Sequence, residues 1–259
     1  MTFEPANPLD LSAKTIFITG GAGAIGRVVV QTLAAHGARV AVNDIVDADE
    51  ARAVLPASER VSYFRADLAQ QPQVQAAFDL VEASLGLPNV VCCHAGMVMV
   101  APVQSYPLDD FDQLMNLNTR AAFIVAQEAV KRWLRAGVQG HLIFTTSWVA
   151  DVPWPEITPY TMSKSAMNAM MRGFARELAQ HGIRANAIAP GIVGAGLSKR
   201  QWDTDPAYRA RASKAIPLGF MQPPESVANA FVFLCSDMAA YMTGSVLLVD
   251  GGCSLYPMD

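Results

Sequence analysis

The stretch Thr19-Gly20-Gly21-Ala22-Gly23-Ala24-Ile25-Gly26 decides the fold predicted for this chain. Residues 15–18 before it are apolar enough for a short buried strand, and residues 25–35 after it carry apolar side chains at helical spacing. A strand, a glycine-rich turn and a helix in this order are typical of a loop that binds a dinucleotide. In this interpretation Gly20 makes the tight turn, and Gly26 lets the helix pack closely on the strand.

The same loop has the features of a phosphate site. The small side chains at Gly23 and Ala24 let the backbone approach a pyrophosphate, and the helix that starts near Ile25 offers unpaired N–H groups at its positive end. A glycine-rich run alone is weak evidence, because glycines also mark simple turns. The interpretation therefore depends on the residues downstream.

Strand-like segments recur along the chain, and helical segments lie between most of them. The strand-like ranges are 14–19, 38–43, 61–65, 89–93, 140–146, 183–189 and 245–249. This alternation predicts right-handed crossovers and a parallel sheet covered on both faces. We therefore expect an α/β fold: one Rossmann-type, doubly wound domain over residues 1–259 with about seven parallel strands. Ligands of such sheets bind beyond the carboxyl ends of the strands.

Composition narrows the possible partners. Hydrophobic residues make up 52% of the 259 residues and charged residues 16%, so we expect apolar surface buried between the subunits of a homodimer or homotetramer. A net charge of −4 without a basic run argues against nucleic acid and membrane partners and favours a small-molecule substrate. The amino terminus lacks a signal-peptide pattern, and no apolar run reaches about 18 residues, so we expect a cytoplasmic protein.

No metal site is expected. The four cysteines show no C-x-x-C spacing: Cys92, Cys93, Cys235 and Cys253. Cys92 and Cys93 would point to opposite faces of a strand, so with His94 they cannot converge on one ion. The other histidines are expected at the surface or in caps, because they fall near the ends of predicted elements: His36, His141 and His181.

Asp44 ends the second predicted strand, 18 residues beyond Gly26. A carboxylate there can accept hydrogen bonds from the adenosine ribose and would repel a 2′-phosphate, which favours NAD over NADP. Arg27, beside the glycine loop, would in contrast tolerate additional phosphate charge. The alternative is that Asp44 only caps a turn. Asp67-Leu68, after the third strand, is expected to contact the adenine, although Asp is also a common cap.

Ser147 follows the fifth predicted strand, and Tyr160 and Lys164 lie on the next helix, where a spacing of four places them on one face. The pKa of a Tyr hydroxyl is about 10, too high for a base at neutral pH. A neighbouring ammonium and a positively charged nicotinamide would both stabilise the phenolate, and lowering its pKa by about three units requires roughly 4 kcal/mol. A lone Tyr-x-x-x-Lys is also an ordinary surface pair.

Further motifs accompany this pair in a fixed order. They are the loop from Thr19 to Gly26, Ala95-Gly96, Asn118, Ser147, Tyr160, Lys164, Pro190-Gly191 and Asp250-Gly251-Gly252. In order and spacing the set resembles the short-chain dehydrogenase/reductase family across essentially the whole chain. The resemblance implies hydride transfer between a nicotinamide cofactor and an alcohol or carbonyl.

The resemblance also implies roles for individual residues. Tyr160 would be the general acid/base, and Ser147 would position the substrate oxygen. Lys164 would lower the pKa of Tyr160 and hold the nicotinamide ribose, while Asn118 would help keep a water that passes the proton to solvent. The cofactor site would be completed by Ala95, Gly96, Pro190, Gly191, Ile192 and Val193.

Three motifs depart from the family pattern. Ala24 replaces the middle glycine of the loop and narrows the approach to the pyrophosphate. Cys93-His94 stands where the family has two asparagines, so an amide that ties neighbouring strands is missing. Gly194 stands where a Thr often contacts the nicotinamide, so backbone groups of Ile192 and Val193 would have to supply that contact.

Substrate choice is assigned to residues around Ser147 and to residues 194–217, which are expected to form a mobile lid. The candidate wall residues are His94, Ser147, Trp148, Trp154, Glu156 and Trp202. Aromatic faces mixed with polar groups suit a ring with several hydroxyls, such as a sugar or polyol. The alternative for either Trp at 148 and 154 is packing in a subunit contact.

The function predicted first is an NAD-dependent oxidoreductase that interconverts a secondary alcohol and its ketone or lactone, with a sugar or polyol as substrate. One alternative is a reductase of a cyclic ketone or a 3-oxoacyl substrate, which could use NADP, although the low positive charge argues against an acyl-carrier-protein partner. Another is a non-catalytic protein that senses NAD. The set Ser147, Tyr160 and Lys164 argues against the sensor, which needs no proton donor.

Overall fold

A computed structural model describes residues 7–255, in which seven parallel strands form one sheet of order β3-β2-β1-β4-β5-β6-β7. The strands are β1 (Thr15–Thr19), β2 (Arg39–Asp44), β3 (Val61–Arg65), β4 (Val90–Cys93), β5 (His141–Thr145), β6 (Arg184–Pro190) and β7 (Val246–Val249). The chain leaves β1 toward β2 and β3, then returns to the other side of β1 with β4. This reversal of strand order confirms the doubly wound α/β fold.

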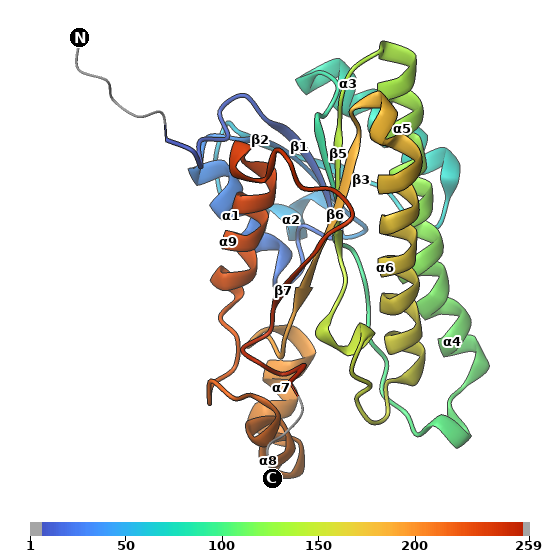
Figure 1. The fold of residues 1–259 in the computed structure, drawn as a ribbon, viewed down its shortest axis with the longest axis vertical. Coiled ribbons are helices and arrows are strands. Elements are labelled where there is room, and N and C mark those ends of the chain that lie inside the picture. The colour runs from blue at the N-terminus through green and yellow to red at the C-terminus, as the bar shows by residue number, and fades with distance from the viewer. Residues whose placement is uncertain (1–6, 256–259) are drawn as a thin grey trace.

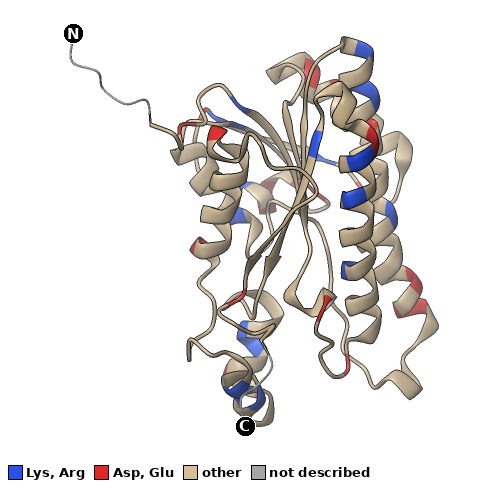
Figure 2. Cartoon of the chain, in the orientation of Figure 1, with Lys and Arg blue, Asp and Glu red and all other residues tan. Residues whose placement is uncertain are grey.

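Helices cover both faces of the sheet. They are α1 (Gly26–Ala35), α2 (Ala48–Val54), α3 (Gln71–Leu85), α4 (Leu108–Met115), α5 (Ala122–Ala136), α6 (Thr158–Leu178), α7 (Gly196–Thr204), α8 (Pro206–Ala215) and α9 (Pro224–Cys235). Figure 1 shows α1 and α9 against one face of the sheet, and α5 and α6 against the other. The charged residues lie mainly on helices and loops, and few lie on the central strands (Figure 2).

Two apolar cores result from the alternation of side chains along the strands. In β1, Phe17 packs with the α3, α5 and α6 layer, whereas Ile16 and Ile18 pack with the α1 and α9 layer. Cys93 and Cys92 divide in the same way, on opposite faces as expected. All five residues of β1 are buried, which explains why this strand reads as a continuous apolar run.

His141 corrects one expectation from the sequence. It begins β5 and is only 3% exposed, although it was predicted at the surface or in a cap. Asn186 of the neighbouring strand donates a 2.9 Å hydrogen bond to its ring. Burial and the nearby Arg184 guanidinium hold the pKa of His141 well below its ordinary value, so the ring is neutral. The prediction was wrong because the ends of this interior strand are also covered.

A π-helical turn over Asn116–Ala121 joins α4 to α5. The helical stretch from Leu108 to Ala136 is therefore interrupted by one wide turn. The wide turn contains Asn118, which is fully buried. Because π-turns often occur at functional sites, this interruption indicates that Asn118 is a candidate functional residue.

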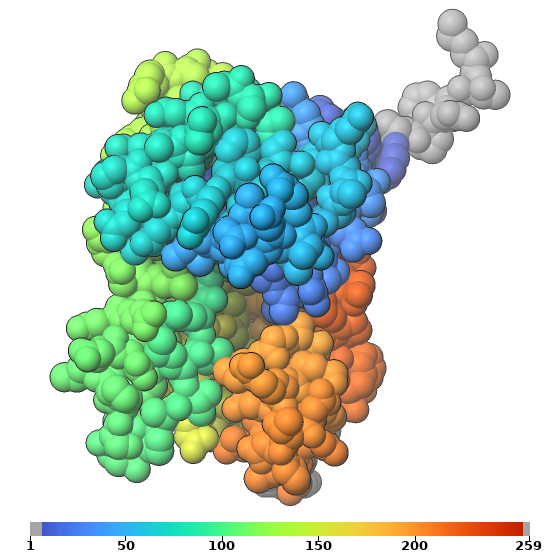
Figure 3. Space-filling view, turned by 180° about the vertical axis from the view of Figure 1, so that it is seen from behind, coloured from blue at the N-terminus to red at the C-terminus, as the bar shows by residue number. Residues whose placement is uncertain are grey.

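Helices α7 and α8 occupy most of the range predicted as a lid and lie beyond the carboxyl ends of the strands (Figure 1). Seen from behind, the orange α7–α8 segment borders a hollow between it, the green region around α4 and the blue amino-terminal elements (Figure 3). Within residues 7–255, no helix has both the length and the apolar character needed to cross a membrane.

Gly26 provides a test of the predicted loop packing. A Cβ at Gly26 would collide with the carbonyl oxygen of Gly20, whereas a Cβ at Gly173, inside α6, would meet open space. Gly26→Ala should lower the free energy of unfolding by about 1–3 kcal/mol, because the backbone of the loop must move. Gly173→Ala should leave it unchanged or raise it by up to about 1 kcal/mol. Urea unfolding measures both; equal stabilities would contradict the packing.

Candidate functional site

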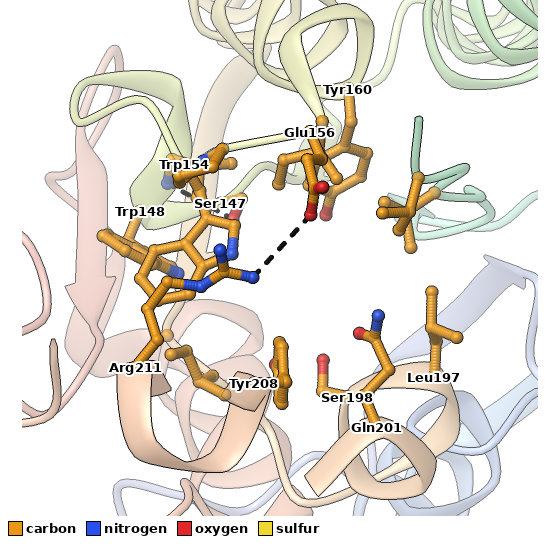
Figure 4. Close-up of a pocket in the computed structure, with 17 residues that line it drawn as sticks. Ser147, Trp148, Trp154, Glu156, Tyr160, Leu197, Ser198, Gln201, Tyr208 and Arg211 are labelled. Carbon is orange, nitrogen blue, oxygen red and sulfur yellow. Dashed lines mark hydrogen bonds and ion pairs between the residues drawn. The ribbon is translucent and has the colours of Figure 1, made fainter. Parts of the chain in front are cut away.

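The site lies where β5 ends and α6 begins. Ser147 directly precedes a short 3₁₀ turn over Trp148–Ala150, and its side chain accepts a 3.4 Å hydrogen bond from the N–H of Val149. Pro159 occupies the first turn of α6, a position that needs no N–H donor, and Tyr160 follows it. Ser147 and Tyr160 line the same pocket, as Figure 4 shows. The structure therefore brings together two hydroxyl groups from segments that are separate in the sequence.

Lys164 lies one helical turn beyond Tyr160 and is only 3% exposed. Its Nζ donates a 2.8 Å hydrogen bond to the carbonyl oxygen of Thr145, the last residue of β5. The same Nζ lies 5.4 Å from the centroid of the Tyr160 ring, within the range of a cation–π contact. Burial lowers the pKa of Lys164 to about 8, because a charged ammonium loses hydration there.

Tyr160 differs from expectation in its acidity. Desolvation raises the pKa of its hydroxyl to about 12, and the hydrogen bond with Ser147 lowers it by less. Lys164 was expected to lower this pKa, but its Nζ bonds to Thr145 and lies over the ring. In the protein alone Tyr160 is therefore neutral at physiological pH, in the form that donates a proton.

Asn118 connects three elements around this pair. Its Oδ1 accepts from the N–H of Met97 at 2.8 Å, and its Nδ2 donates to the carbonyl oxygen of Met97 at 2.9 Å. The second N–H of Nδ2 bonds to the hydroxyl of Ser163 at 3.0 Å, which in turn donates to the carbonyl oxygen of Tyr160 at 2.7 Å. Both donors of the amide are thus used, and Asn118 fixes the position of the turn that carries Tyr160.

The glycine loop is suited to a dinucleotide. Gly20 has a φ of +68°, and a Cβ there would lie 2.7 Å from the Cα of Ala95. Among the described residues no side chain caps the start of α1, and the N–H groups of Ala24, Ile25 and Gly26 donate no hydrogen bond, so these groups are available to an anion. A Cβ at Gly196, the first residue of α7, would lie 3.8 Å from the methyl of Ala24, so this helix begins beside the loop.

Asp44 is held beside the same loop. Its Oδ2 accepts a hydrogen bond from the N–H of Ala22 at 3.0 Å, and its Oδ1 accepts from Ile45 at 2.8 Å. A carboxylate has about four acceptor positions, so it can still accept from ribose hydroxyls. Asp67 accepts from the N–H of Ala69 at 2.9 Å, which is a local turn, and Leu68 is buried in the apolar core.

Thr19 compensates for one departure from the family pattern. Its Oγ1 accepts hydrogen bonds from the N–H groups of His94 and Ala95, both at 3.0 Å, and ties β1 to the end of β4. Cys93 makes only a 3.7 Å contact with the carbonyl oxygen of Ala122. Gly96 follows, and a Cβ there would lie 3.3 Å from Nζ of Lys164. A side chain at Gly96 would therefore press on the side chains of both Asn118 and Lys164.

The segment after β6 is fixed by its backbone. A Cβ at Gly191 would lie 2.6 Å from the carbonyl oxygen of Asp250, and the N–H of Gly191 donates to Gln222 at 2.7 Å. Ile192 and Val193 are buried, and the N–H of Gln222 donates to the carbonyl oxygen of Ile192 at 2.9 Å. This arrangement keeps the chain from Pro190 to Val193 next to the pocket.

The pocket beside Ser147 and Tyr160 includes some of the predicted wall residues and excludes others. Trp148 and Trp154 line it, with ring centroids 5.6 Å apart, and so does Glu156. His94 lies outside this lining, because its Nδ1 is 3.0 Å from Oγ1 of Thr145 and its ring packs edge-on against Phe231. Burial lowers the pKa of His94 to about 4, so it is neutral.

Trp202 also lies outside the lining and packs against the apolar cluster of Trp148, Ile192 and Tyr208. Its neighbour on α7, Gln201, faces the pocket instead. The sequence analysis missed five lining residues of the lid: Leu197, Ser198, Gln201, Tyr208 and Arg211. The helical spacing of Leu197 and Gln201 on α7 contained the only available signal, because a lone Arg on a short helix is usually a solvated residue.

Comparison with known proteins agrees with this geometry. The family model described as Enoyl-(Acyl carrier protein) reductase matches residues 20–254. A "3beta-hydroxysteroid dehydrogenase 1" of Eggerthella lenta is 31% identical over 252 residues, which cover 96% of each chain. A "2,5-dichloro-2,5-cyclohexadiene-1,4-diol dehydrogenase" of Sphingobium indicum is 34% identical over 248 residues, covering 94% of this chain and 98% of that protein.

A solved structure, a gluconate 5-dehydrogenase from Burkholderia cenocepacia in complex with NADP and tartrate, superposes with a TM-score of 0.87 at 28% identity. The superposition covers 96% of this chain and 98% of that one. The relatives and the family model span nearly the whole chain, which therefore belongs to the short-chain dehydrogenase/reductase family. This is an enzyme family of nicotinamide-dependent oxidoreductases, as the sequence motifs implied.

The burial of Lys164 predicts a pH-dependent stability for the cofactor-free protein. With a pKa of about 8 when folded and 10.5 as its ordinary value, Lys164 binds protons more weakly in the folded state. Its contribution to stability is therefore unfavourable below pH 8 and improves as the pH rises toward 10. Lys164→Met should raise the free energy of unfolding at pH 7 by about 1–3 kcal/mol.

The advantage of Lys164→Met should shrink between pH 8 and pH 10, as measured by urea unfolding at each pH. Lys131→Met, which removes an exposed ammonium from α5, is the matched control and should show no such trend. A variant less stable than the parent at pH 7 would contradict the assignment of Lys164 as a buried, costly charge.

Proposed function

We propose that the protein is a dehydrogenase that interconverts a secondary alcohol and its ketone, with Tyr160 as general acid/base. The observation that carries this proposal is the convergence of Ser147 and Tyr160 in one pocket, with the Lys164 ammonium 5.4 Å from the tyrosine ring centroid. An NAD sensor without turnover would need none of these three groups. The dehydrogenases among the relatives support the same class of reaction.

In this mechanism the chain supplies binding and proton transfer. Ser147 donates a hydrogen bond to the substrate oxygen, and Tyr160 exchanges a proton with that oxygen. When bound, the nicotinamide supplies the hydride chemistry and, in its oxidised form, a positive charge near the phenol. Lys164 binds a ribose hydroxyl and stabilises the phenolate, while Asn118 holds the turn that carries Tyr160. Asn118 is also proposed to help keep a water that passes the proton to solvent.

The cofactor site is proposed to include Gly20, Gly23, Ala24, Ile25 and Gly26 for the pyrophosphate. The fit is supported by the free N–H groups of Ala24, Ile25 and Gly26 and by the close approaches that only glycine permits at Gly20 and Gly26. Asp44 would accept from the ribose hydroxyls, so NAD is the proposed cofactor. The gluconate 5-dehydrogenase binds NADP, which keeps NADP as the alternative.

The substrate is proposed to be a hydroxylated ring, with a sugar or polyol as the first candidate. Trp148 and Trp154 offer faces to ring C–H groups, and Gln201 and Ser198 offer hydrogen bonds. The apolar part of the lining, which includes Val98, Val100, Ile157, Ile192 and Leu197, favours a second candidate, a less hydroxylated cyclic alcohol or ketone. The named activities of the steroid and cyclohexadiene-diol relatives support this second candidate.

We further propose a homo-oligomeric, cytoplasmic enzyme without nucleic-acid or membrane partners. An apolar recess between α5, α6 and the π-turn supports self-association, since Phe123 and Met170 line it and Phe123 is 43% exposed. A mass measurement in solution distinguishes a dimer from a tetramer.

Tyr160→Phe tests the central role directly. Initial rates of NADH formation from NAD with a panel of sugars, polyols and cyclic secondary alcohols should fall by about 10²-fold or more, because the proton acceptor is removed while the ring remains. NAD affinity should change little. Thr161→Val, which alters a hydroxyl one residue away, is the control. Activity retained in Tyr160→Phe would contradict the assigned role.

Asp44→Ala tests the cofactor assignment separately. Removing the carboxylate should raise the ratio of kcat/KM for NADP to that for NAD by about tenfold or more, because repulsion of the 2′-phosphate is lost. Asp47→Ala, three residues further on at the start of α2, is the control. An unchanged ratio in Asp44→Ala would show that Asp44 only fixes the loop through Ala22.

A further inference from the structure

Arg211 is the one arginine in the lining of the pocket that contains Ser147 and Tyr160. It comes from α8, on the lid side, and Figure 4 shows its guanidinium reaching toward Glu156 across the space in front of Ser147. The substrate class proposed above, a hydroxylated ring, does not by itself require a cation there. The position of this guanidinium therefore calls for a separate explanation.

The guanidinium is held in place by aromatic packing. Its Cζ lies 5.2 Å from the centroid of the Trp154 ring, and Trp154 packs edge-on against Trp148 at 5.6 Å and Tyr208 at 6.5 Å. Tyr208 is only 7% exposed and belongs to the apolar cluster with Trp148 and Ile192, so the rings that support Arg211 are themselves held in place. A planar cation stacked on a fixed ring is oriented before any ligand arrives, which lowers the entropy lost on binding.

Most of the hydrogen-bonding capacity of Arg211 is unused. A guanidinium has five N–H donors, and within residues 7–255 the polar contact of Arg211 is one ion pair that is too long for a hydrogen bond. Its nearest carboxylate is that of Glu156, with Nη2 and Oε2 3.8 Å apart, which is beyond hydrogen-bond length. Both side chains are about half exposed, so this ion pair is weak and can separate at low cost.

Glu156 has an unusual backbone as well. Its φ of +66° is the only positive value at a non-glycine position among the described residues. Its carbonyl oxygen accepts a 2.9 Å hydrogen bond from the N–H of Ala101, which ties this strained turn to the segment after β4. Strain of this kind is concentrated at binding sites, and here it places a carboxylate opposite Arg211.

We propose that Arg211 binds a carboxylate of the substrate, and that Glu156 partners Arg211 only while the pocket is empty. The substrate is then a hydroxy acid, in which a ring joins the reacting hydroxyl carbon to an anionic group. A guanidinium matches a carboxylate through two parallel hydrogen bonds, a geometry that the long contact to Glu156 does not reach. This inference rests on the proposed dehydrogenase function, since it assigns the far end of the same substrate.

The test uses a ligand that cannot be oxidised at the site. Isothermal titration calorimetry of the full chain saturated with NAD compares cyclohexanecarboxylate with cyclohexanecarboxamide, which has the same ring without the charge. The parent should bind the carboxylate about tenfold more tightly than the amide. Arg211→Gln should remove this preference. Arg211→Lys should restore part of it, because an ammonium keeps the positive charge but lacks the two parallel N–H donors of a guanidinium.

Two further variants complete the design. Glu156→Gln should strengthen carboxylate binding by about threefold or more, because the competing internal carboxylate is lost. Lys214→Gln, which removes an exposed charge from the same helix α8, should leave the preference unchanged. Circular dichroism checks that each variant is folded.

Equal affinity of the parent for the two compounds, or no saturable binding of cyclohexanecarboxylate, would overturn the proposal. A preference that survives Arg211→Gln would also overturn it. These outcomes are independent of the proposed chemistry, because oxidation of neutral cyclic alcohols that depends on Tyr160 would remain intact.

Discussion

The buried ammonium of Lys164 is the constraint on which the site depends. It is held between the end of β5, through the carbonyl oxygen of Thr145, and the ring of Tyr160 on the same helix. A charge in this position is costly, since burial lowers its pKa to about 8. The surrounding elements accommodate it: Gly96 leaves room at Nζ, and Asn118 and Ser163 fix the first turn of α6. The buried Lys164 ammonium therefore lowers the free energy of unfolding but places a positive charge at a fixed position in the site.

This arrangement explains why the hydroxyl of Tyr160 stays protonated in the protein without a cofactor. Desolvation raises the pKa of the phenol to about 12, and the ammonium is engaged with a carbonyl oxygen. In the proposed function, the remaining stabilisation of a phenolate would come from the positive charge of an oxidised nicotinamide. Proton removal from the substrate would then be restricted to the enzyme that has its cofactor bound, a coupling that follows from burial and charge alone.

The sequence predicted the sheet and the one-turn separation of Tyr160 and Lys164, because strand alternation and helical spacing determine them. Local patterns contain no information on which distant side chains share a pocket. Trp202 was predicted to line it, but the adjacent Gln201 does so, since the Trp202 side chain packs against the buried cluster that contains Tyr208. The sequence did not predict that Arg211 lines the pocket, and it predicted His141 at the surface although this residue is buried. The reason is the same in both cases, because the surroundings of each side chain are formed by residues that are distant in the sequence.

The acidity of Tyr160 is the quantity that tests this account most directly. Carbon-13 NMR of protein labelled at the tyrosine ring carbon that bears the hydroxyl, assigned with Tyr160→Phe, follows its ionisation with pH. The account predicts ionisation near pH 12 in the protein alone and a shift downward by several pH units when NAD is bound. Ionisation near neutral pH without the cofactor, or a pKa that NAD leaves unchanged, would contradict the account.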